Sequence, residues 1–355
     1  METHGADIYT ASKLSGIDKF SIIDFSSNIN PLGITVAVKQ AAMNGIEGSF
    51  RYPDIESREL RESISSYESV PTGWIFTSNG AAEAIYRIVM HLKPKKGLVT
   101  APAFGEYESA LKASGSAISR YTLREEHNFK IGEDMLDIIR EDTDIVFVCN
   151  PNNPTGQLTR MDMVEKILDR CSKMGAVTVI DECFLDFVRD KEKYSTVKLL
   201  QKYENLIVLK AFTKIYAIPG IRLGYCLCSD SGMVEGLKSS GPPWNVSTVA
   251  QVAGAAALRE TEYVKRTVAY VEKQREYLVG ELQNLNIKTY ESHANYILFR
   301  TKEINLKDEM LKRGILIRSC ANYEGLSREY FRIAVKTEGE NRLFIETLKE
   351  VTEII

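Results

Sequence analysis

A lysine in the second half of the chain has the surroundings of a nucleophile. Lys214 follows the apolar run 206–209, which is typical of a buried strand, and precedes Pro219-Gly220, which must turn the chain. A lysine held in such a half-buried bend is partly desolvated, so its pKa falls and its amine can attack a carbonyl to form a Schiff base. From the spacing alone, a solvated loop lysine is the competing interpretation.

An acidic residue stands at the end of another apolar run. Residues 177–180 predict a short buried strand, and Asp181 follows directly. A carboxylate in this position needs a cationic partner or dense hydrogen bonding. A protonated pyridine nitrogen would be such a partner, and the pairing would keep the ring cationic as an acceptor of electrons. A helix cap is the alternative for a lone aspartate.

A small-residue loop between a strand and a helix forms a candidate anion site. Residues 74–77 predict the strand and residues 83–92 the helix. Backbone N–H groups at a helix N-terminus attract negative charge, and small side chains let a phosphate approach closely. Helix packing is the ordinary alternative for such a loop. The candidate phosphate contacts are Gly80, Ala81 and Ala82.

Two further strand ends carry an aromatic ring and amide donors. Phe104 lies just beyond the strand 98–100, where its ring could stack on a heteroaromatic cofactor or pack in the core. The strand 144–149 runs into Asn-Pro-Asn-Asn-Pro-Thr-Gly at 150–156, where prolines and glycine fix the backbone and leave the amides as donors. Because strands and helices alternate from about residue 70, we expect an α/β fold with a parallel sheet whose carboxyl edge collects these residues.

The two ends of the chain predict separate structural units. Asn-Ile-Asn-Pro-Leu-Gly at 28–33 is typical of an Asx turn. Helices are expected over 36–44, from Pro53 or Asp54 onward, and over 248–284. Strands are expected at 295–299, 315–318 and 330–335. We therefore expect an N-terminal segment covering the site (1–44), a large domain (45–250) and a small C-terminal domain (251–355).

Composition bounds the class of protein without naming its function. The 355 residues are 44% apolar, enough for one large core and a second, smaller one. A net charge of -3 and the lack of a basic stripe argue against nucleic acid or an anionic membrane as a partner. The six cysteines and four histidines do not cluster as metal ligands, and we expect no metal. No signal peptide or membrane-spanning run is recognisable, so a cytoplasmic protein with free thiols is expected.

The segment 209–225 resembles the cofactor-lysine motif of fold-type I aminotransferases, with a hydroxyl residue, a Schiff-base lysine, Pro-Gly and Arg-x-Gly in succession. The resemblance implies pyridoxal 5′-phosphate as the cofactor, a mostly parallel central sheet in a large domain and a smaller α/β C-terminal domain. It assigns Lys214 to the Schiff base, Asp181 to the ring nitrogen and Asn153 to the phenolic oxygen. The other implied cofactor contacts are Gly80, Ala81, Ala82, Phe104, Thr213 and Arg222.

The same resemblance implies an assembly and one lost contact. Tyr52 matches the family tyrosine that reaches the cofactor phosphate of the neighbouring subunit, so a two-fold homodimer with a composite site is expected. Ala211 stands where the family usually has Ser or Thr, which removes one expected hydroxyl contact to the phosphate.

Over nearly its whole length the chain resembles histidinol-phosphate aminotransferases, and it is closer to the L-threonine O-3-phosphate decarboxylases of cobamide synthesis. One sign is Phe184, where the aminotransferases usually have a Tyr whose hydroxyl touches the phenolic oxygen of the cofactor. Ala6, Asp7 and Ser247 depart from the decarboxylase pattern. The resemblance implies a small phosphorylated amino acid as substrate. Its implied contacts are His4, Asn30 and Arg318 for the phosphate and Arg332 for the carboxylate.

Three functions therefore compete. The first is decarboxylation of L-threonine O-3-phosphate, and also of L-serine phosphate, in which the Cα–carboxylate bond stands upright on the cofactor ring. The second is amino transfer from histidinol phosphate to 2-oxoglutarate, in which Lys214 removes the Cα proton. The third is a non-catalytic binding protein built on the same fold, against which the intact Lys214 and Asp181 argue.

Overall fold

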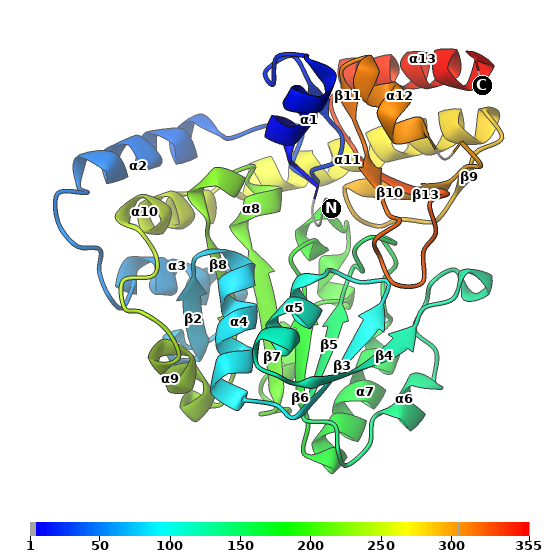
Figure 1. Cartoon of the computed structure of the whole chain (residues 1–355). Coiled ribbons are helices and arrows are strands. Elements are labelled where there is room, and N and C mark those ends of the chain that lie inside the picture. Colours follow the sequence, from blue (N-terminus) through cyan, green and yellow to red (C-terminus); the bar gives the residue numbers. More distant parts are fainter. Residues whose placement is uncertain (1–4, 304, 355) are drawn as a thin grey trace.

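A seven-stranded sheet organises the larger part of the molecule (Figure 1). The computed structural model describes residues 5–303 and 305–354. All neighbouring strands run parallel except at β8, which is antiparallel to both of its neighbours. The mostly parallel central sheet is therefore confirmed. In spatial order its strands are β2 (Ile75–Ser78), β8 (Gly224–Leu227), β7 (Leu206–Ala211), β6 (Val177–Asp181), β5 (Ile145–Cys149), β3 (Lys96–Ala101) and β4 (Ala117–Thr122).

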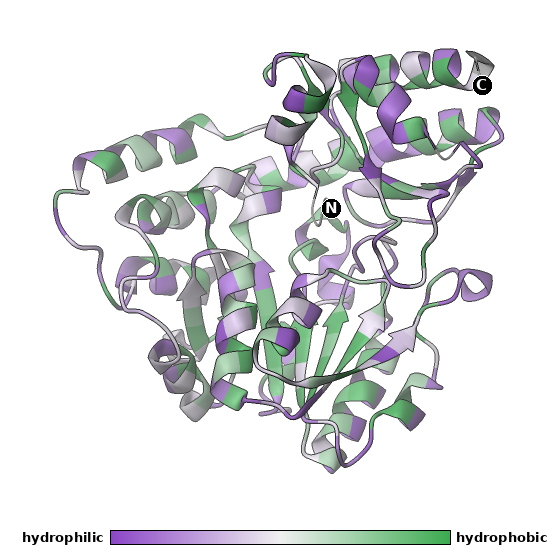
Figure 2. Ribbon diagram, in the orientation of Figure 1, coloured by the Kyte–Doolittle hydropathy of each residue, from purple (hydrophilic) through white to green (hydrophobic). Residues whose placement is uncertain are grey.

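Helices cover both faces of this sheet because its strands are apolar on both sides. Successive side chains of β5 enter two different cores, since they alternate across the sheet: Phe147 packs on one face, and Val146 on the other. Figure 2 shows these strands as mostly hydrophobic. The first face carries α4 (Gly80–Leu92), α5 (Glu106–Ala113) and α9 (Ser231–Ser239). The second carries α3 (Arg58–Glu68), α7 (Met161–Met174), α10 (Thr248–Ala257) and α11 (Thr261–Asn284), with α6 (Met135–Ile138) beside α7.

The smaller unit contains a second sheet of mostly C-terminal strands. Its antiparallel order is β12 (Arg318–Ser319), β13 (Tyr330–Ala334), β10 (Tyr296–Arg300) and β9 (Lys288–Thr289). α13 (Glu338–Ile354) packs on α11 and on α12 (Leu306–Lys312), and its Phe344 shares a hydrophobic core with Phe299 of β10. The N-terminal strand β1 (Ile23–Asp24) pairs in parallel with β11 (Ile315–Leu316), and α1 (Ile8–Ser15) contacts α12. The beginning of the chain therefore joins the unit formed by its end.

Three expected elements have different limits. The helix expected from Pro53 or Asp54 begins at Arg58, because the Asp54 carboxylate accepts a hydrogen bond from Arg58 N at 2.7 Å from outside the helix. The helix expected over 248–284 is divided into α10 and α11: α10 packs on α2 (Val36–Glu47) and α3, while α11 runs on toward the small sheet. The strand expected at 315–318 is also divided, since β11 pairs with β1 and β12 with β13.

Because the chain forms two separate sheets, we propose that it has a large and a small domain. Because α10 packs on α2 and α3, the structure groups residues 248–257 with the larger unit. A boundary at 250/251 would cut this helix. In the part of the chain that the structure describes, no helix is both long and apolar enough to cross a membrane.

Candidate active site

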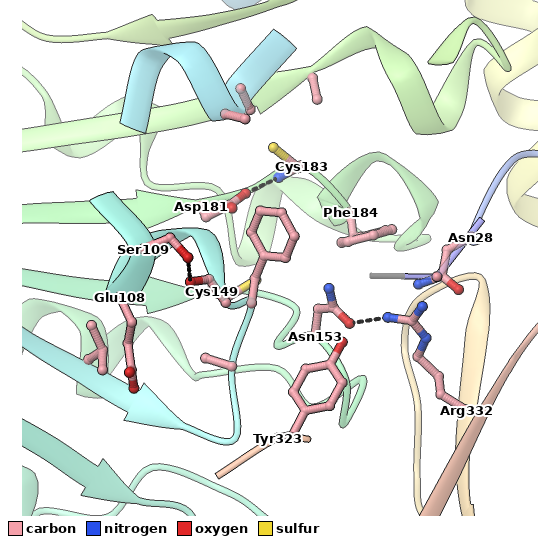
Figure 3. A pocket seen from close by; sticks show the side chains of 18 of the residues that line it. Asn28, Glu108, Ser109, Cys149, Asn153, Asp181, Cys183, Phe184, Tyr323 and Arg332 are labelled. Carbon is pink, nitrogen blue, oxygen red and sulfur yellow. Dashed lines mark hydrogen bonds between the residues drawn. The ribbon is translucent and has the colours of Figure 1, made fainter. Parts of the chain in front are cut away.

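A cavity of about 700 Å³ lies where the carboxyl ends of the parallel strands meet the small unit and the N-terminal segment (Figure 3). Each of β3, β5, β6 and β7 contributes its last residue to the wall. The predicted site residues that line it are Ala81, Ala82, Phe104, Asn153, Asp181, Thr213, Lys214, Arg222 and Arg332. The sheet edge therefore brings together most of the residues that the sequence singled out.

Lys214 lies in a short helix, α8 (Phe212–Ile215), that begins directly after β7. Its side chain is half-buried and faces the cavity. Burial is the main cause that lowers the pKa of Lys214 to about 8, and the positive charge of Arg332 lowers it further. Near neutral pH an appreciable fraction of this amine is unprotonated, so it can act as a nucleophile.

Asp181 is held by two donors from the protein. Its side chain is buried at the end of β6. The backbone N–H of Cys183 donates to Oδ1 at 2.9 Å, and the hydroxyl of Tyr107 donates to Oδ2 at 2.5 Å. The dense hydrogen bonding expected around this carboxylate is present, and each oxygen keeps lone-pair capacity for a donor in the cavity. The sequence analysis did not identify Tyr107. Its position in the first turn of α5, three residues after Phe104, could have indicated that it lies near the site.

The N-terminus of α4 and Arg222 form a cradle at one end of the cavity. Gly80 has φ +77°, and a Cβ placed on it would lie 2.6 Å from Nη2 of Arg222. Only glycine allows the guanidinium to come this close to the helix N-terminus. Thr213 adds a hydroxyl, whereas Ala211 lines the wall without one. Backbone N–H groups, a hydroxyl and a guanidinium together form a donor set suited to a phosphate group.

Arg332 connects the small unit to the large one across the cavity. Its Nη1 donates to Asn153 Oδ1 at 2.5 Å (Figure 3). Its Nη2 donates to the carbonyl of Ser26 at 2.8 Å. Because a guanidinium can only donate, the amide oxygen of Asn153 must face Arg332. The amide nitrogen then faces away from the arginine, where it can serve as the expected donor.

Asn30 does not line the cavity, and this prediction is corrected. Its Nδ2 lies 2.6 Å from Ile215 O, 2.8 Å from Tyr263 Oη and 2.8 Å from Thr267 Oγ1, so its donors are used within the protein. Asn28, two residues earlier, does line the cavity. Its buried Oδ1 has no hydrogen-bond partner among the described residues. The turn motif at 28–33 contains both asparagines, so the sequence alone does not show which of them faces the site. The choice depends on how the turn passes over α8.

Two other predicted residues, Arg318 and Tyr52, do not line the cavity. Arg318 is buried behind the lining: its Nη2 donates to Asn322 Oδ1 at 2.8 Å, and its guanidinium lies 5.6 Å from the ring centroid of Tyr323. Asn322 and Tyr323 are the residues of this loop that reach the cavity. Tyr52 is 81% exposed on another surface. His4 lies outside the described residues.

The three departures from the decarboxylase pattern have local structural roles. Ala6 lines the cavity and donates its N–H to Ser26 Oγ at 2.7 Å. The Asp7 carboxylate accepts from Thr10 N and caps α1, and the Ser247 hydroxyl accepts from Ala250 N and caps α10.

These features fit the expected cofactor. The Gly80–Arg222 cradle suits its phosphate, Asp181 can accept from its ring nitrogen, Asn153 can donate to its phenolic oxygen, and Lys214 supplies an amine for its aldehyde. All of these groups face one cavity or adjoin it.

Comparisons with known proteins give a consistent family. The family model described as aminotransferase class I and II matches residues 21–348. A threonine-phosphate decarboxylase of Salmonella typhimurium is 35% identical over 98% of this chain and 96% of its own length. The crystal structure of the histidinol-phosphate aminotransferase from Clostridium acetobutylicum has a TM-score of 0.87 and 32% identity, covering 93% of this chain and 99% of that one. That of the L-threonine-O-3-phosphate decarboxylase from Porphyromonas gingivalis has a TM-score of 0.82 and 25% identity, with coverage of 93% and 99%.

Proposed function

This chain belongs to the class I and II aminotransferase family and is a pyridoxal 5′-phosphate-dependent enzyme, and we propose that it decarboxylates L-threonine O-3-phosphate. The product is (R)-1-amino-2-propanol phosphate, which serves the nucleotide loop of cobamides. L-Serine phosphate is proposed as a second substrate. The similarity to a threonine-phosphate decarboxylase over 98% of the chain supports this assignment.

The cofactor, when bound, supplies an aldehyde that condenses with amines and a ring that accepts the electron pair of a bond broken at the substrate α carbon. Lys214 supplies the amine that holds the aldehyde, and its lowered pKa makes that amine available. Asp181 accepts a hydrogen bond from the ring nitrogen. Arg222, Thr213 and the N-terminus of α4 hold the phosphate.

The observation that carries the choice of reaction is Phe184. Its ring lines the cavity, packs edge-on against Tyr296 at 5.0 Å between centroids, and has Lys214 Nζ 5.9 Å from its centroid. No hydroxyl is available at this position beside the amine, which is where the related aminotransferases place one. The apolar ring at this position distinguishes the chain from the related aminotransferases and supports the decarboxylase assignment.

The two ends of the substrate have different anchors in this proposal. Arg332 binds the carboxylate as a charge-assisted donor and so orients the bond that breaks. The phosphate lies toward the N-terminal segment, where Asn28 lines the cavity and its amide nitrogen can donate, and where Arg318 lies behind Asn322. Holding both ends lets the protein choose which bond at the α carbon stands upright on the ring.

The test separates decarboxylation from amino transfer. Purified holoenzyme is incubated with L-threonine phosphate, L-serine phosphate or histidinol phosphate, and CO2 and 2-oxoglutarate-dependent amine transfer are measured separately. We expect CO2 from threonine phosphate without a keto acid, and none from the Lys214→Ala variant. The similarity to a histidinol-phosphate aminotransferase with a TM-score of 0.87 favours the runner-up. Conversion of histidinol phosphate alone, with 2-oxoglutarate, would establish that function instead. Absence of cofactor absorption and of both reactions would favour a binding protein.

A matched pair of asparagine variants tests the phosphate end. Asn28→Ala should raise KM for threonine phosphate about 10-fold or more, the effect of one hydrogen bond to a charged group, and leave the cofactor absorption unchanged. Asn30→Ala should instead lower the thermal stability, because Asn30 ties the N-terminal segment to α8 and α11. An unchanged KM in Asn28→Ala would remove Asn28 from the substrate site.

We also propose that the enzyme is a two-fold homodimer with Tyr52 completing the partner's site. Tyr52 packs against Trp244, which is also exposed, with 4.8 Å between the ring centroids and the rings tilted by 33°. The exposed apolar residues of α2 and the segment after it are Val36, Met43, Ile46, Phe50 and Ile55. A solvent-exposed group of this kind marks an interaction surface.

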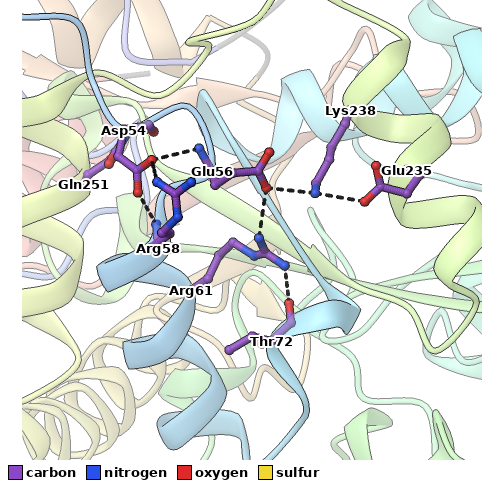
Figure 4. A network of polar contacts seen from close by, with 8 residues as sticks. All are labelled: Asp54, Glu56, Arg58, Arg61, Thr72, Glu235, Lys238 and Gln251. Carbon is purple, nitrogen blue, oxygen red and sulfur yellow. Dashed lines mark hydrogen bonds and ion pairs between the residues drawn. The ribbon is translucent and has the colours of Figure 1, made fainter.

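A polar network connects the residues just after Tyr52 to α3, α9 and α10 (Figure 4). Lys238 pairs with Glu56 at 2.9 Å, Arg61 pairs with Glu56 at 3.2 Å, and Gln251 donates to the carbonyl of Asp54 at 2.9 Å. The segment is therefore presented as a rigid edge rather than a free loop.

Mixing two inactive variants tests the composite site. Tyr52→Ala and Lys214→Ala subunits should each have low activity, and a re-equilibrated equal mixture should regain about a quarter of the wild-type activity, because half of the dimers then hold one intact site. A mixture that stays inactive, or an active enzyme that sediments as a monomer, would contradict this assembly.

A further inference from the structure

A buried tyrosine directly behind the cavity wall has a hydroxyl that the assigned roles leave unexplained. Tyr107 is 1% exposed and does not line the cavity. Its ring stacks on Phe147 with 5.0 Å between centroids and meets Phe104 edge-on at 5.8 Å. These ring contacts explain the aromatic side chain. They do not explain the hydroxyl, which reaches Asp181 Oδ2 at 2.5 Å.

The hydroxyl of Tyr107 acts as a permanent donor to Asp181. Burial raises the pKa of Tyr107 well above its ordinary value of 10, and the negative charge of Asp181 raises it further. The phenol therefore keeps its proton at any working pH. Since an ionised carboxylate only accepts hydrogen bonds, the direction of this bond is fixed.

The hydrogen bond matters because Asp181 is buried. A carboxylate without enough donors in such a place takes up a proton rather than keeping its charge. Besides Tyr107, Cys183 is the residue that hydrogen-bonds to the Asp181 carboxylate in the described ranges, through its backbone N–H at 2.9 Å from Oδ1 and through its thiol. Removal of the phenol would take away the 2.5 Å hydroxyl donor of Oδ2.

We propose that Tyr107 is a positioning residue for the reaction: its hydroxyl orients Asp181 and stabilises the ionised carboxylate, so that a proton shared with the cofactor ring nitrogen stays on the nitrogen. This inference rests on the role of Asp181 in the proposed function. A protonated ring nitrogen is what makes the ring an effective acceptor of electrons. Tyr107 therefore acts on the chemistry without touching the substrate.

The first test measures the ring nitrogen itself in the absence of substrate. The holoenzyme is reconstituted with cofactor labelled with ¹⁵N in the ring, and the ¹⁵N resonance of the wild type is compared with that of Tyr107→Phe. We expect the resonance of the variant to move toward the position of an unprotonated pyridine. Because no substrate is present, this result does not depend on which reaction the enzyme performs.

The second test uses a cofactor analogue in which carbon replaces the ring nitrogen. With the natural cofactor, Tyr107→Phe should lower kcat by about 10- to 100-fold with little change in KM, the effect of one hydrogen bond to a charged group. With the deaza analogue, wild type and variant should differ by less than about twofold, because there is no nitrogen for Asp181 to act on. Equal slowing with both cofactors would mean that Tyr107 has only a structural role.

Tyr121→Phe is the matched control. Tyr121 is also buried, and its hydroxyl donates to Asp134 Oδ1 at 2.6 Å, away from the cavity. This variant loses the same kind of bond and should leave the ¹⁵N resonance where it is. An unmoved resonance in Tyr107→Phe would overturn the proposal.

If Tyr107→Phe does not fold, Tyr107→His decides the question. The imidazole replaces the phenol with a donor of shorter reach, so we expect a smaller shift of the resonance in the same direction. An unmoved resonance in this variant would also overturn the proposal.

Discussion

Lys210 and Lys214 lie four residues apart and have opposite electrostatic surroundings. Lys210 is 3% exposed on β7, with Nζ 2.9 Å from Glu182 and 3.7 Å from Glu68. Burial alone would lower its pKa, but the two carboxylates raise the pKa of Lys210 well above the ordinary value of 10.5. Lys214 faces the cavity, and burial together with Arg332 lowers its pKa to about 8.

The comparison shows that burial does not by itself make a lysine reactive. Both amines lose hydration, and the presence or absence of a close carboxylate decides whether the result is a fixed cation or a nucleophile. Two neighbouring acidic residues also differ in whether they face the cavity or form a buried ion pair. Asp181 and Glu182 are consecutive, so their side chains leave the backbone in opposite directions. Asp181 reaches the cavity, and Glu182 reaches Lys210.

The largest expected effect comes from removing the reactive lysine. Lys214→Ala should lower decarboxylation by roughly 10²- to 10⁴-fold or more and abolish covalent capture of the cofactor. Its free energy of unfolding should change little, because Lys214 forms no ion pair with an acid among the described residues, in contrast to Lys210. Lys214→Arg is the control that keeps the charge without the nucleophile. Substantial CO2 release by either variant would contradict the assignment.

Removing the paired lysine should affect stability instead. Lys210→Met leaves Glu182 buried without its cation, and we expect the free energy of unfolding, measured in urea, to fall by about 3–5 kcal/mol. Lys210→Met combined with Glu182→Gln should recover much of this loss, because no buried charge is then left alone. If the free energy of unfolding falls equally in the single and the double variant, Lys210 and Glu182 do not stabilise the protein as a pair.

The lowered pKa of Lys214 predicts a pH dependence. Only the unprotonated amine attacks the aldehyde, so the rate at which apoenzyme captures the cofactor should rise about tenfold per pH unit below 8 and level off above it. Stopped-flow absorbance measures this rate. A rate that keeps rising toward the ordinary value of 10.5 would mean that Lys214 is as well hydrated as a surface lysine.

The smallest expected effect is a shift in the pKa of Lys214 when the positive charge of Arg332 is removed. Arg332→Gln removes a positive charge that lowers the pKa of Lys214, so the midpoint of the same pH profile should move upward. Arg275→Gln is a suitable control, since Arg275 is a partly buried cation that donates to Ala294 O and lies outside the cavity lining. An unchanged midpoint in Arg332→Gln would show that the charge of Arg332 does not lower the pKa of Lys214.

The amino-acid sequence by itself determined the parts that depend on local pattern. Apolar runs placed β2, β3, β5, β6 and β7 within two residues, and several of these runs lead into residues that line the cavity, such as Asp181 and Phe104. The edge strand β4 was not predicted, because most of its side chains are exposed or half-buried and form no apolar run. Because parallel strands all present their carboxyl ends at one edge, the site could be located before its geometry was known. Lys214 in a half-buried bend was predicted from the same pattern.

Only the tertiary structure decided the features that depend on contacts between distant segments. Asn28 rather than Asn30 faces the cavity because Asn30 bonds to α8 and α11, more than a hundred residues away. β1 pairs with β11, so the start of the chain joins the small unit. Tyr107 and Lys210 have ordinary surroundings in the sequence. Their roles come from carboxylates on neighbouring strands and helices, and a hydrogen bond or ion pair of this kind leaves no local pattern to read.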